Sequence, residues 1–163
     1  MVRNLKIIFA VIFAVWGLFG GSMNLVGYDG GLSYVESVTS MSHKDPEARA
    51  PWATSNPVII HLGFALIWGA KLLGGILCAI GARNMWRTRN GSAGDFNAAK
   101  GHAVAGLGVY LIMLIGGFNL FGAVIYSLWA GPAAVAFDLS WVFAGEIGLI
   151  MIFMNMRDDE VPV

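Results

Sequence analysis

Four long apolar stretches, separated by polar segments, dominate the pattern of the chain. They run over residues 7–25, 57–81, 103–130 and 139–156. A helix needs about 20 mostly apolar residues to cross roughly 30 Å of hydrocarbon, and all four stretches reach or nearly reach that length. The pattern therefore predicts an all-α polytopic membrane protein, in which residues 1–163 form one domain, a bundle of four transmembrane helices.

The polar connections between these stretches differ in length and character. Residues 85–95 form a short, basic segment rich in Gly and Ser, which is typical of a hairpin between two spans. The first connection, 27–56, is long for so small a bundle, and such loops usually carry function or structure of their own. Within it Leu32, Val35, Val38 and Met41, with Tyr34 beside them, fall near helical spacing, which predicts a short amphipathic helix on the outer membrane surface. This helix either covers the bundle, or serves as a lid or a docking site for another protein.

The distribution of basic residues predicts how the helices are oriented. Three polar regions carry them: the N-terminus, the second connection and the C-terminus, with Arg3, Lys6, Arg83, Arg87, Arg89, Lys100 and Arg157. Basic residues near membrane spans mark the cytoplasmic side, so both termini are expected in the cytoplasm. The first stretch also fits a signal peptide, because Arg3 and Lys6 precede it; we expect it to be retained as a span.

Composition strengthens the membrane assignment and excludes one class of partner. The chain is 57% hydrophobic and 12% charged, whereas soluble proteins carry roughly 25% charged residues. The formal net charge is zero, and no long basic block could supply the electrostatic attraction that nucleic-acid binding needs. Membrane lipids, and not nucleic acid, are therefore the expected surroundings. The single cysteine, Cys78, lies in an apolar run, and we expect it to serve as a small packing residue.

Two charged residues interrupt the apolar stretches and need a partner. Lys71 precedes Arg83 by 12 residues and Glu146 precedes Arg157 by 11, which puts both roughly 17 Å from the cytoplasmic boundary at about 1.5 Å per residue. A lone charge at that depth costs at least about 2.5 kcal/mol. The sequence therefore predicts an ion pair between Lys71 and Glu146. The pair would either fix which helices are neighbours, or line a path for a proton or substrate, or hold a polar headgroup such as that of a quinone or lipid.

Glycine is abundant, with 22 residues, and many lie inside the spans. Small residues allow membrane helices to approach closely. The residues expected to serve this packing are Gly17 and Gly21, which form a GxxxG pair, Gly74 and Gly75 beside Lys71, and Gly101 with Ala105 at the entry to the third span. The close contacts could lie within one chain or between neighbouring subunits.

No constellation of residues indicates catalysis or a resident cofactor. His61 and His102 lie near opposite ends of their spans, so one chain is not expected to offer both to one haem, and His43 lies in the external loop. The Cys and His spacing does not fit a zinc site, and phosphate-binding and nucleophile motifs are missing. We therefore expect no catalytic residue, no metal, no cofactor and no enzymatic activity.

Two stretches carry a resemblance to a known family. "YDGGLSYVESVTSM" (28–41) and "FNAAKGHAVAGLGV" (96–109) make the chain resemble a bacterial family of predicted small integral membrane proteins, a domain of unknown function with about four helices. The matching positions are Tyr28, Tyr34, Val35, Ser40, Met41, Phe96, Ala99 and Lys100. After the third span the chain keeps Trp129, Ala136 and Phe137 but lacks a glutamate that the family carries. The resemblance covers essentially the whole chain and implies a multi-pass protein of the bacterial inner membrane, without a known activity.

Three functions remain open at this point. The small size, the glycine-rich faces and the external loop favour a noncatalytic accessory or assembly subunit of a larger respiratory or photosynthetic membrane complex, with Tyr34, Val35, Val38 and Met41 as docking residues. A small transporter or proton-coupled carrier would use Lys71 and Glu146. A redox subunit would bind haem or quinone shared with another chain.

Overall fold

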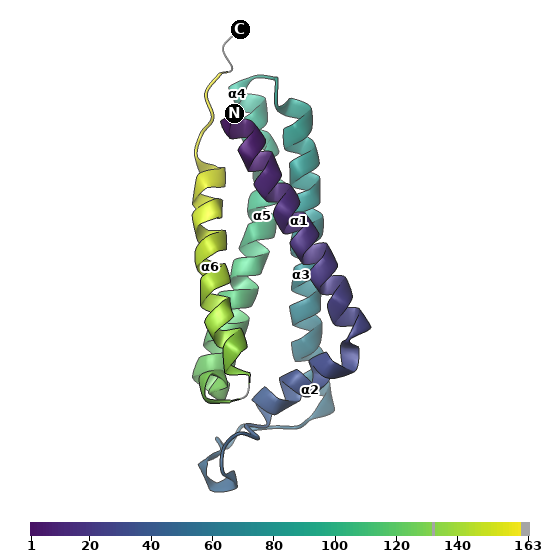
Figure 1. The fold of residues 1–163 in the computed structure, drawn as a ribbon, viewed down its shortest axis with the longest axis vertical. Helices are drawn as coiled ribbons and strands as arrows, with labels where there is room; N and C mark the ends of the chain where they lie inside the picture. Colours follow the sequence, from purple (N-terminus) through teal and green to yellow (C-terminus); the bar gives the residue numbers. More distant parts are fainter. Residues whose placement is uncertain (132, 161–163) are drawn as a thin grey trace.

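The computed structural model describes residues 1–131 and 133–160, and these residues contain helices and no strand. Four helical segments are long and apolar enough to cross a membrane (Figure 1). They are α1 (Val2–Val26), α3 (Pro57–Thr88), a third segment over Ala93–Ile125 and α6 (Ala134–Asn155). The third segment consists of α4 (Ala93–Ala99), α5 (Gly101–Leu111) and η2 (Ile112–Ile125), the last with π-helical hydrogen bonding. The predicted all-α membrane bundle is confirmed.

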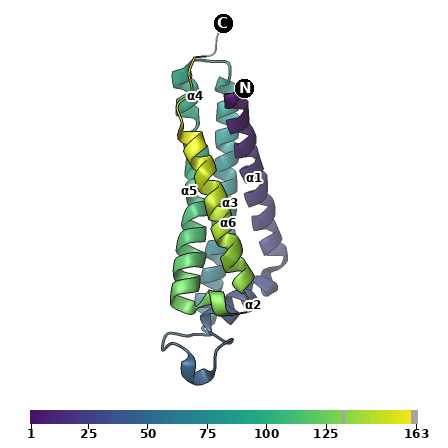
Figure 2. The ribbon, with the colours of Figure 1, turned by 60° about the vertical axis from the view of Figure 1, so that its left-hand side comes forward.

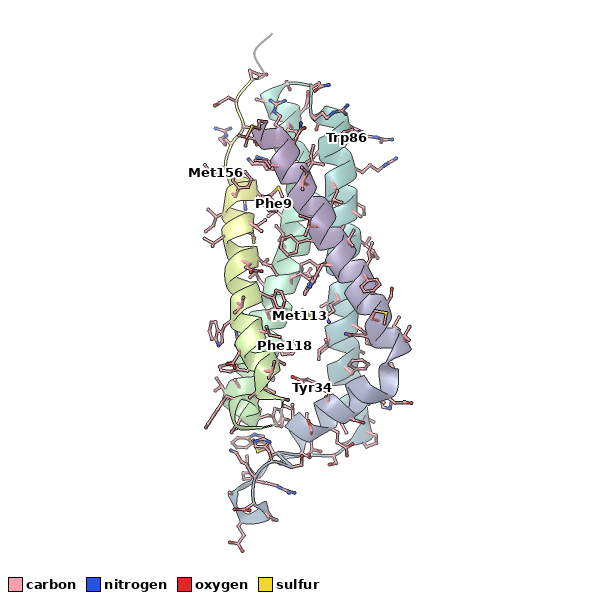
Figure 3. The ribbon with its side chains drawn as sticks, in the orientation of Figure 1. Phe9, Tyr34, Trp86, Met113, Phe118 and Met156 are labelled. Atoms are coloured by element: carbon pink, nitrogen blue, oxygen red, sulfur yellow. The ribbon has the colours of Figure 1, made fainter. Side chains whose placement is uncertain are left out.

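The helices form two packed pairs that meet through α5. The first helix, α1, crosses α3 along much of its length, α3 packs on α5, and α6 packs on α5 and η2 (Figures 1 and 2). Near the termini, Phe9 of α1 lies between α1 and α6 (Figure 3), and its ring meets Phe153 edge-on with a centroid distance of 6.0 Å. The start of α1 and the end of α6 lie at one end of the bundle, called here the terminal end. The short helix α2 (Tyr28–Thr39) lies at the opposite end, called the α2 end.

The third span ends before the apolar run does. Its helix stops at Ile125, whereas the apolar run continues to Ala130. Ser127 has a φ of 56°, which is unfavourable for a residue with a side chain inside a helix. The chain then makes the short 3-10 helix η3 (Leu128–Ala130). Hydropathy alone does not mark this end, because these residues remain apolar after the helix has ended.

The amphipathic helix expected in the first external loop is present as α2, but its apolar face points inward. Val35 packs with Ile60 and Phe64 of α3, and Met41, just beyond α2, is only 1% exposed. Tyr34 and Val38 are half-buried. Val35 and Met41 are therefore not available for docking, because the chain's own bundle covers them, whereas Tyr34 and Val38 are only partly covered. The other interpretation, a cover over the end of the bundle, agrees with the structure.

Glycines occur where helices approach most closely. A side chain on Gly21 would meet Leu72 at 2.7 Å, and one on Gly75 would meet the backbone nitrogen of Leu18 at 2.8 Å. Gly17 and Gly74 both face the ring of Tyr110, whose hydroxyl donates a hydrogen bond of 2.9 Å to the carbonyl of Phe13. These four glycines serve contacts within the chain, one of the two possibilities that the sequence left open. Gly74 and Gly75 make room for Tyr110 and α1.

The second predicted pair of small residues faces outward. Gly101 and Ala105 are exposed, and nothing lies within 4 Å of a side chain added to Gly101. They do not pack any helix of this chain, so the intramolecular interpretation is wrong for this pair.

Candidate functional site

Lys71 and Glu146 do not form the predicted ion pair. The salt bridges among the described residues join Asp158 to Lys6 and to Lys100. The ammonium of Lys71 lies instead 5.9 Å from the ring centroid of Trp16, on α1. The pair is not formed because α3 packs on α1 and α5, whereas α6 packs on α5 and η2. Equal depth in the membrane did not make these two helices neighbours.

The carboxyl of Glu146 lies on the outer surface of the bundle. Glu146 is exposed, and Val142 and Leu149, which lie on the same side of α6, are 54% and 71% exposed. Nothing lies within 4 Å of side chains added to Gly145 or Gly148. We call this surface the Glu146 face: an apolar strip with one carboxyl in it and with room for another helix to approach closely.

Four buried polar atoms lack a hydrogen-bond partner among the described residues. They are the hydroxyl of Tyr34, the ring nitrogen Nε2 of His43, the indole nitrogen of Trp68 and the amide nitrogen of Asn119. Trp68 lies one turn from Lys71 on α3 and packs, like Tyr34, against the buried cluster under α2. Burial raises the pKa of Tyr34 to about 12, so its phenol is a donor at neutral pH. Unsatisfied buried donors cost roughly 1–3 kcal/mol each, and an acceptor group from outside this chain could satisfy them.

The strongest polar cluster closes the terminal end. One carboxylate oxygen of Asp158, Oδ2, accepts hydrogen bonds from Lys6 Nζ at 2.6 Å and Lys100 Nζ at 2.9 Å. Both ammonium groups also donate to the carbonyl of Met156. The side chains of the two lysines and Asp158 are at most 6% exposed. We call these three residues the ion cluster; it ties the C-terminal segment to α1 and to the start of α5.

Main-chain contacts hold the same segment in place. The side-chain oxygen of Asn97 accepts from the backbone N–H of Asp158 at 3.0 Å, and its nitrogen donates to the carbonyl of Asp158 at 3.1 Å. The guanidinium of Arg3 donates to the carbonyls of Arg89, Gly91 and Asp159. Segment 156–160 therefore joins the end of α6 to α1 and to the start of the third span, and Arg3 connects it to the segment that follows α3.

Sequence reasoning recognised only part of this cluster. Lys100 belongs to the stretch that carries the family resemblance, but Lys6 was interpreted only as a signal of orientation, and Asp158 was not considered. The available signal was the short acidic run "DDE" (158–160) directly after the last span, opposite a basic N-terminus.

We expect the stability of the purified protein to fall as the pH is lowered below about 4. Burial raises the pKa of the Asp158 carboxyl, but the hydrogen bonds and charges of Lys6 and Lys100 lower it by more, so the folded-state pKa lies below its ordinary value. The carboxylate therefore stabilises the fold above the unfolded pKa of about 3.9, and this stabilisation is lost as the pH falls through the folded-state pKa. Thermal unfolding in detergent from pH 7 to pH 3 measures the effect. Asp158→Asn should remove this part of the pH dependence, and Asp159→Asn, at an exposed neighbour, should retain it.

These features define a polytopic membrane protein of four helices, with a buried ion cluster at one end and a carboxyl on its outer face. The chain belongs to the family described as predicted small integral membrane protein (DUF2165), whose model matches residues 2–157. Neither the curated proteins nor the solved structures contain a match. The family resemblance expected from the residues 28–41 and 96–109 is thereby confirmed.

Proposed function

We propose that this chain is a noncatalytic accessory or assembly subunit of a larger complex in the bacterial inner membrane, and that a partner helix docks on the Glu146 face. The observation that carries the proposal is the position of Glu146: a carboxyl exposed on the outside of a membrane-spanning helix. No described part of the chain itself supplies a hydrogen bond or cation to it.

The depth of Glu146 makes exposure to lipid unfavourable. It lies 12 residues from the start of α6 and 9 from its end, which corresponds to roughly 18 Å and 14 Å along the helix axis. A charged carboxyl near the bilayer centre costs about 2.5 kcal/mol or more. A short side chain such as Glu cannot reach water over that distance. A partner that offers a cation or a hydrogen-bond donor at this depth removes the cost.

The surroundings of Glu146 suit helix docking. Gly145, next to Glu146, and Gly148 leave open space at the surface of α6, and small residues let the backbones of membrane helices come close enough for strong packing and interhelical hydrogen bonds. The neighbouring Val142 and Leu149 are exposed and supply apolar contact area. The partner is therefore expected to be a transmembrane helix with one Arg, Lys, Asn or Gln among apolar residues.

The distribution of charge supports the proposed orientation. The terminal end carries the basic residues Arg3, Lys6, Arg83, Arg87, Arg89, Lys100 and Arg157, whereas Lys44 and Arg49 at the α2 end lie among Glu36, Asp45 and Glu47. Since basic residues mark the cytoplasmic side, both termini face the cytoplasm and α2 lies on the outer surface.

We expect that capture of the tagged chain from gently solubilised native membranes recovers a membrane partner in stoichiometric amount. Leu149→Trp, which places a bulky ring beside Glu146, should reduce that recovery at least tenfold, because the ring occupies the space that the partner helix needs. The matched control is Leu66→Trp on α3, whose site is 73% exposed compared with 71% for Leu149. Quantitative mass spectrometry of the captured material measures both.

Two results would contradict the proposal. The wild-type chain could come out of its native membrane alone, or Leu149→Trp could recover the partner as well as Leu66→Trp does. Glu146→Gln serves as a milder variant: it keeps the shape and hydrogen-bonding capacity of the side chain, so partial recovery indicates that the charge itself contributes.

A further inference from the structure

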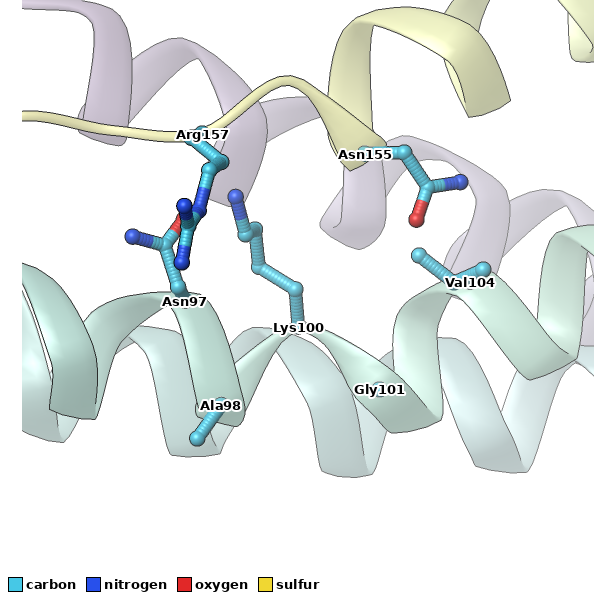
Figure 4. Close-up of a pocket in the computed structure, with 7 residues that line it drawn as sticks. All are labelled: Asn97, Ala98, Lys100, Gly101, Val104, Asn155 and Arg157. Atoms are coloured by element: carbon cyan, nitrogen blue, oxygen red, sulfur yellow. The ribbon is translucent and has the colours of Figure 1, made fainter.

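A pocket of about 240 Å³ opens at the terminal end, between the start of α5 and the segment that follows α6 (Figure 4). Asn97, Lys100 and Gly101 form one wall, and Asn155 and Arg157 form the other. In Figure 4 the side chains of Lys100 and Arg157 extend toward each other from opposite walls. The pocket therefore brings two cationic side chains together from segments far apart in the sequence.

The residues that line this pocket include two cationic side chains, those of Lys100 and Arg157, and no acidic one. In the ion cluster, two ammonium groups share one carboxylate oxygen of Asp158, which leaves one positive charge in excess. Arg157 is exposed and donates no hydrogen bond to a described residue. The carboxylate of Glu160 accepts from the backbone N–H of Ala93, and neither Glu160 nor the exposed Asp159 lines the pocket. An anion in the pocket would compensate the excess charge and accept hydrogen bonds from the guanidinium, whose planar set of donors suits phosphate oxygens.

From Gly101, on the wall of the pocket, a strip of small residues continues along α5 toward the apolar part of the bundle. Gly101, Ala105 and Gly108 recur at helical spacing along one side of α5, and nothing lies within 4 Å of side chains added to Gly101 or Gly108. Ala105 between them is exposed. This strip of small residues leaves space along the helix surface in which an acyl chain could lie directly below a headgroup in the pocket.

From these observations we infer that the pocket binds the phosphate of an anionic phospholipid headgroup, with Arg157 as the principal contact and the ion cluster as the source of additional positive potential. The site lies at the end of the membrane-spanning part of α5 and α6, which is the level of lipid phosphates. Basic pockets between transmembrane helices on the cytoplasmic side bind such headgroups. The pocket shares no residue with the Glu146 face, and lipid binding in the pocket does not depend on a protein partner.

The test compares the thermal stability of the purified full-length chain in an uncharged detergent with added phosphatidylglycerol, phosphatidylcholine or inorganic phosphate. We expect phosphatidylglycerol to raise the unfolding temperature in a saturable way, and phosphatidylcholine to have little effect. Arg157→Gln should weaken the apparent affinity for phosphatidylglycerol about fivefold, as expected for the loss of one basic side chain at a membrane surface. Arg83→Gln is the matched control, because Arg83 is an exposed arginine at the same end, on α3 and outside the pocket.

A second variant tests the shape of the site without changing its charge. Gly101→Leu fills the open space on the wall of the pocket and should weaken phosphatidylglycerol binding while leaving the unfolding temperature without lipid nearly unchanged. Inorganic phosphate could raise the unfolding temperature in the same saturable way, with the same loss of apparent affinity in Arg157→Gln. The pocket would then be a phosphate site whose ligand is a soluble anion and not a lipid. If both variants respond to phosphatidylglycerol as the wild type does, or if phosphatidylcholine stabilises equally, the inference is overturned.

Discussion

Asp158→Ala is expected to lower the free energy of unfolding by about 3–5 kcal/mol, the range typical of breaking a buried ion pair from one side. The variant removes the one carboxylate shared by Lys6 and Lys100. Two ammonium groups then remain buried with only the carbonyl of Met156 as a common acceptor. Their mutual repulsion and lost hydration are no longer compensated, so the C-terminal segment should detach from α1 and α5.

Reversible unfolding in detergent, followed by circular dichroism, measures this loss. Asp159→Ala is the control, because Asp159 is the exposed neighbouring residue and its carboxylate takes no part in the ion cluster. The double variant Lys6→Met/Asp158→Ala should recover part of the stability, since it removes one of the two uncompensated cations. If Asp158→Ala and Asp159→Ala have the same effect, the ion cluster does not hold the terminal end together.

The long helices could be predicted because the signal for a membrane span is local. A run of about 20 apolar residues must span the bilayer as a helix wherever its neighbours lie, since backbone polar groups find no other partners in hydrocarbon. The short helix α2 could also be predicted from a local signal, because its apolar positions recur at helical spacing. The residues at which the helices end were harder to predict. The end of η2 at Ile125 depends on the backbone of Ser127, for which hydropathy carries no signal.

Contacts between helices could not be predicted in the same way. Lys71 and Glu146 were placed at equal depth from the sequence, but depth says nothing about which helices are neighbours or how each is rotated. The structure rotates Glu146 outward and places Lys71 against α1, near Trp16. The ion cluster was missed for a related reason: Asp158 follows the last helix, and no periodic pattern shows where a nonhelical segment folds.

The contact between α1 and α3 should be the part of the fold most sensitive to added volume. Gly75→Leu is expected to destabilise the chain by about 3 kcal/mol, at the upper end of the usual range for overpacking. A side chain at this position meets the backbone nitrogen of Leu18 at 2.8 Å and the carbonyl of Ala14 at 3.1 Å. Backbone atoms within a helix cannot move aside as a flexible side chain can, so α1 as a whole must shift away from α3.

The matched control lies on the same helix. Gly69 belongs to α3 as well, but nothing lies within 4 Å of a side chain added there, so Gly69→Leu should change the free energy of unfolding by less than about 1 kcal/mol. Because both variants replace Gly by Leu in one helix, their difference isolates packing from helix propensity. Unfolding in detergent measures the difference directly. Equal stability of the two variants would contradict the close α1–α3 contact, and with it the assignment of Gly17, Gly21 and Gly75 to packing within the chain.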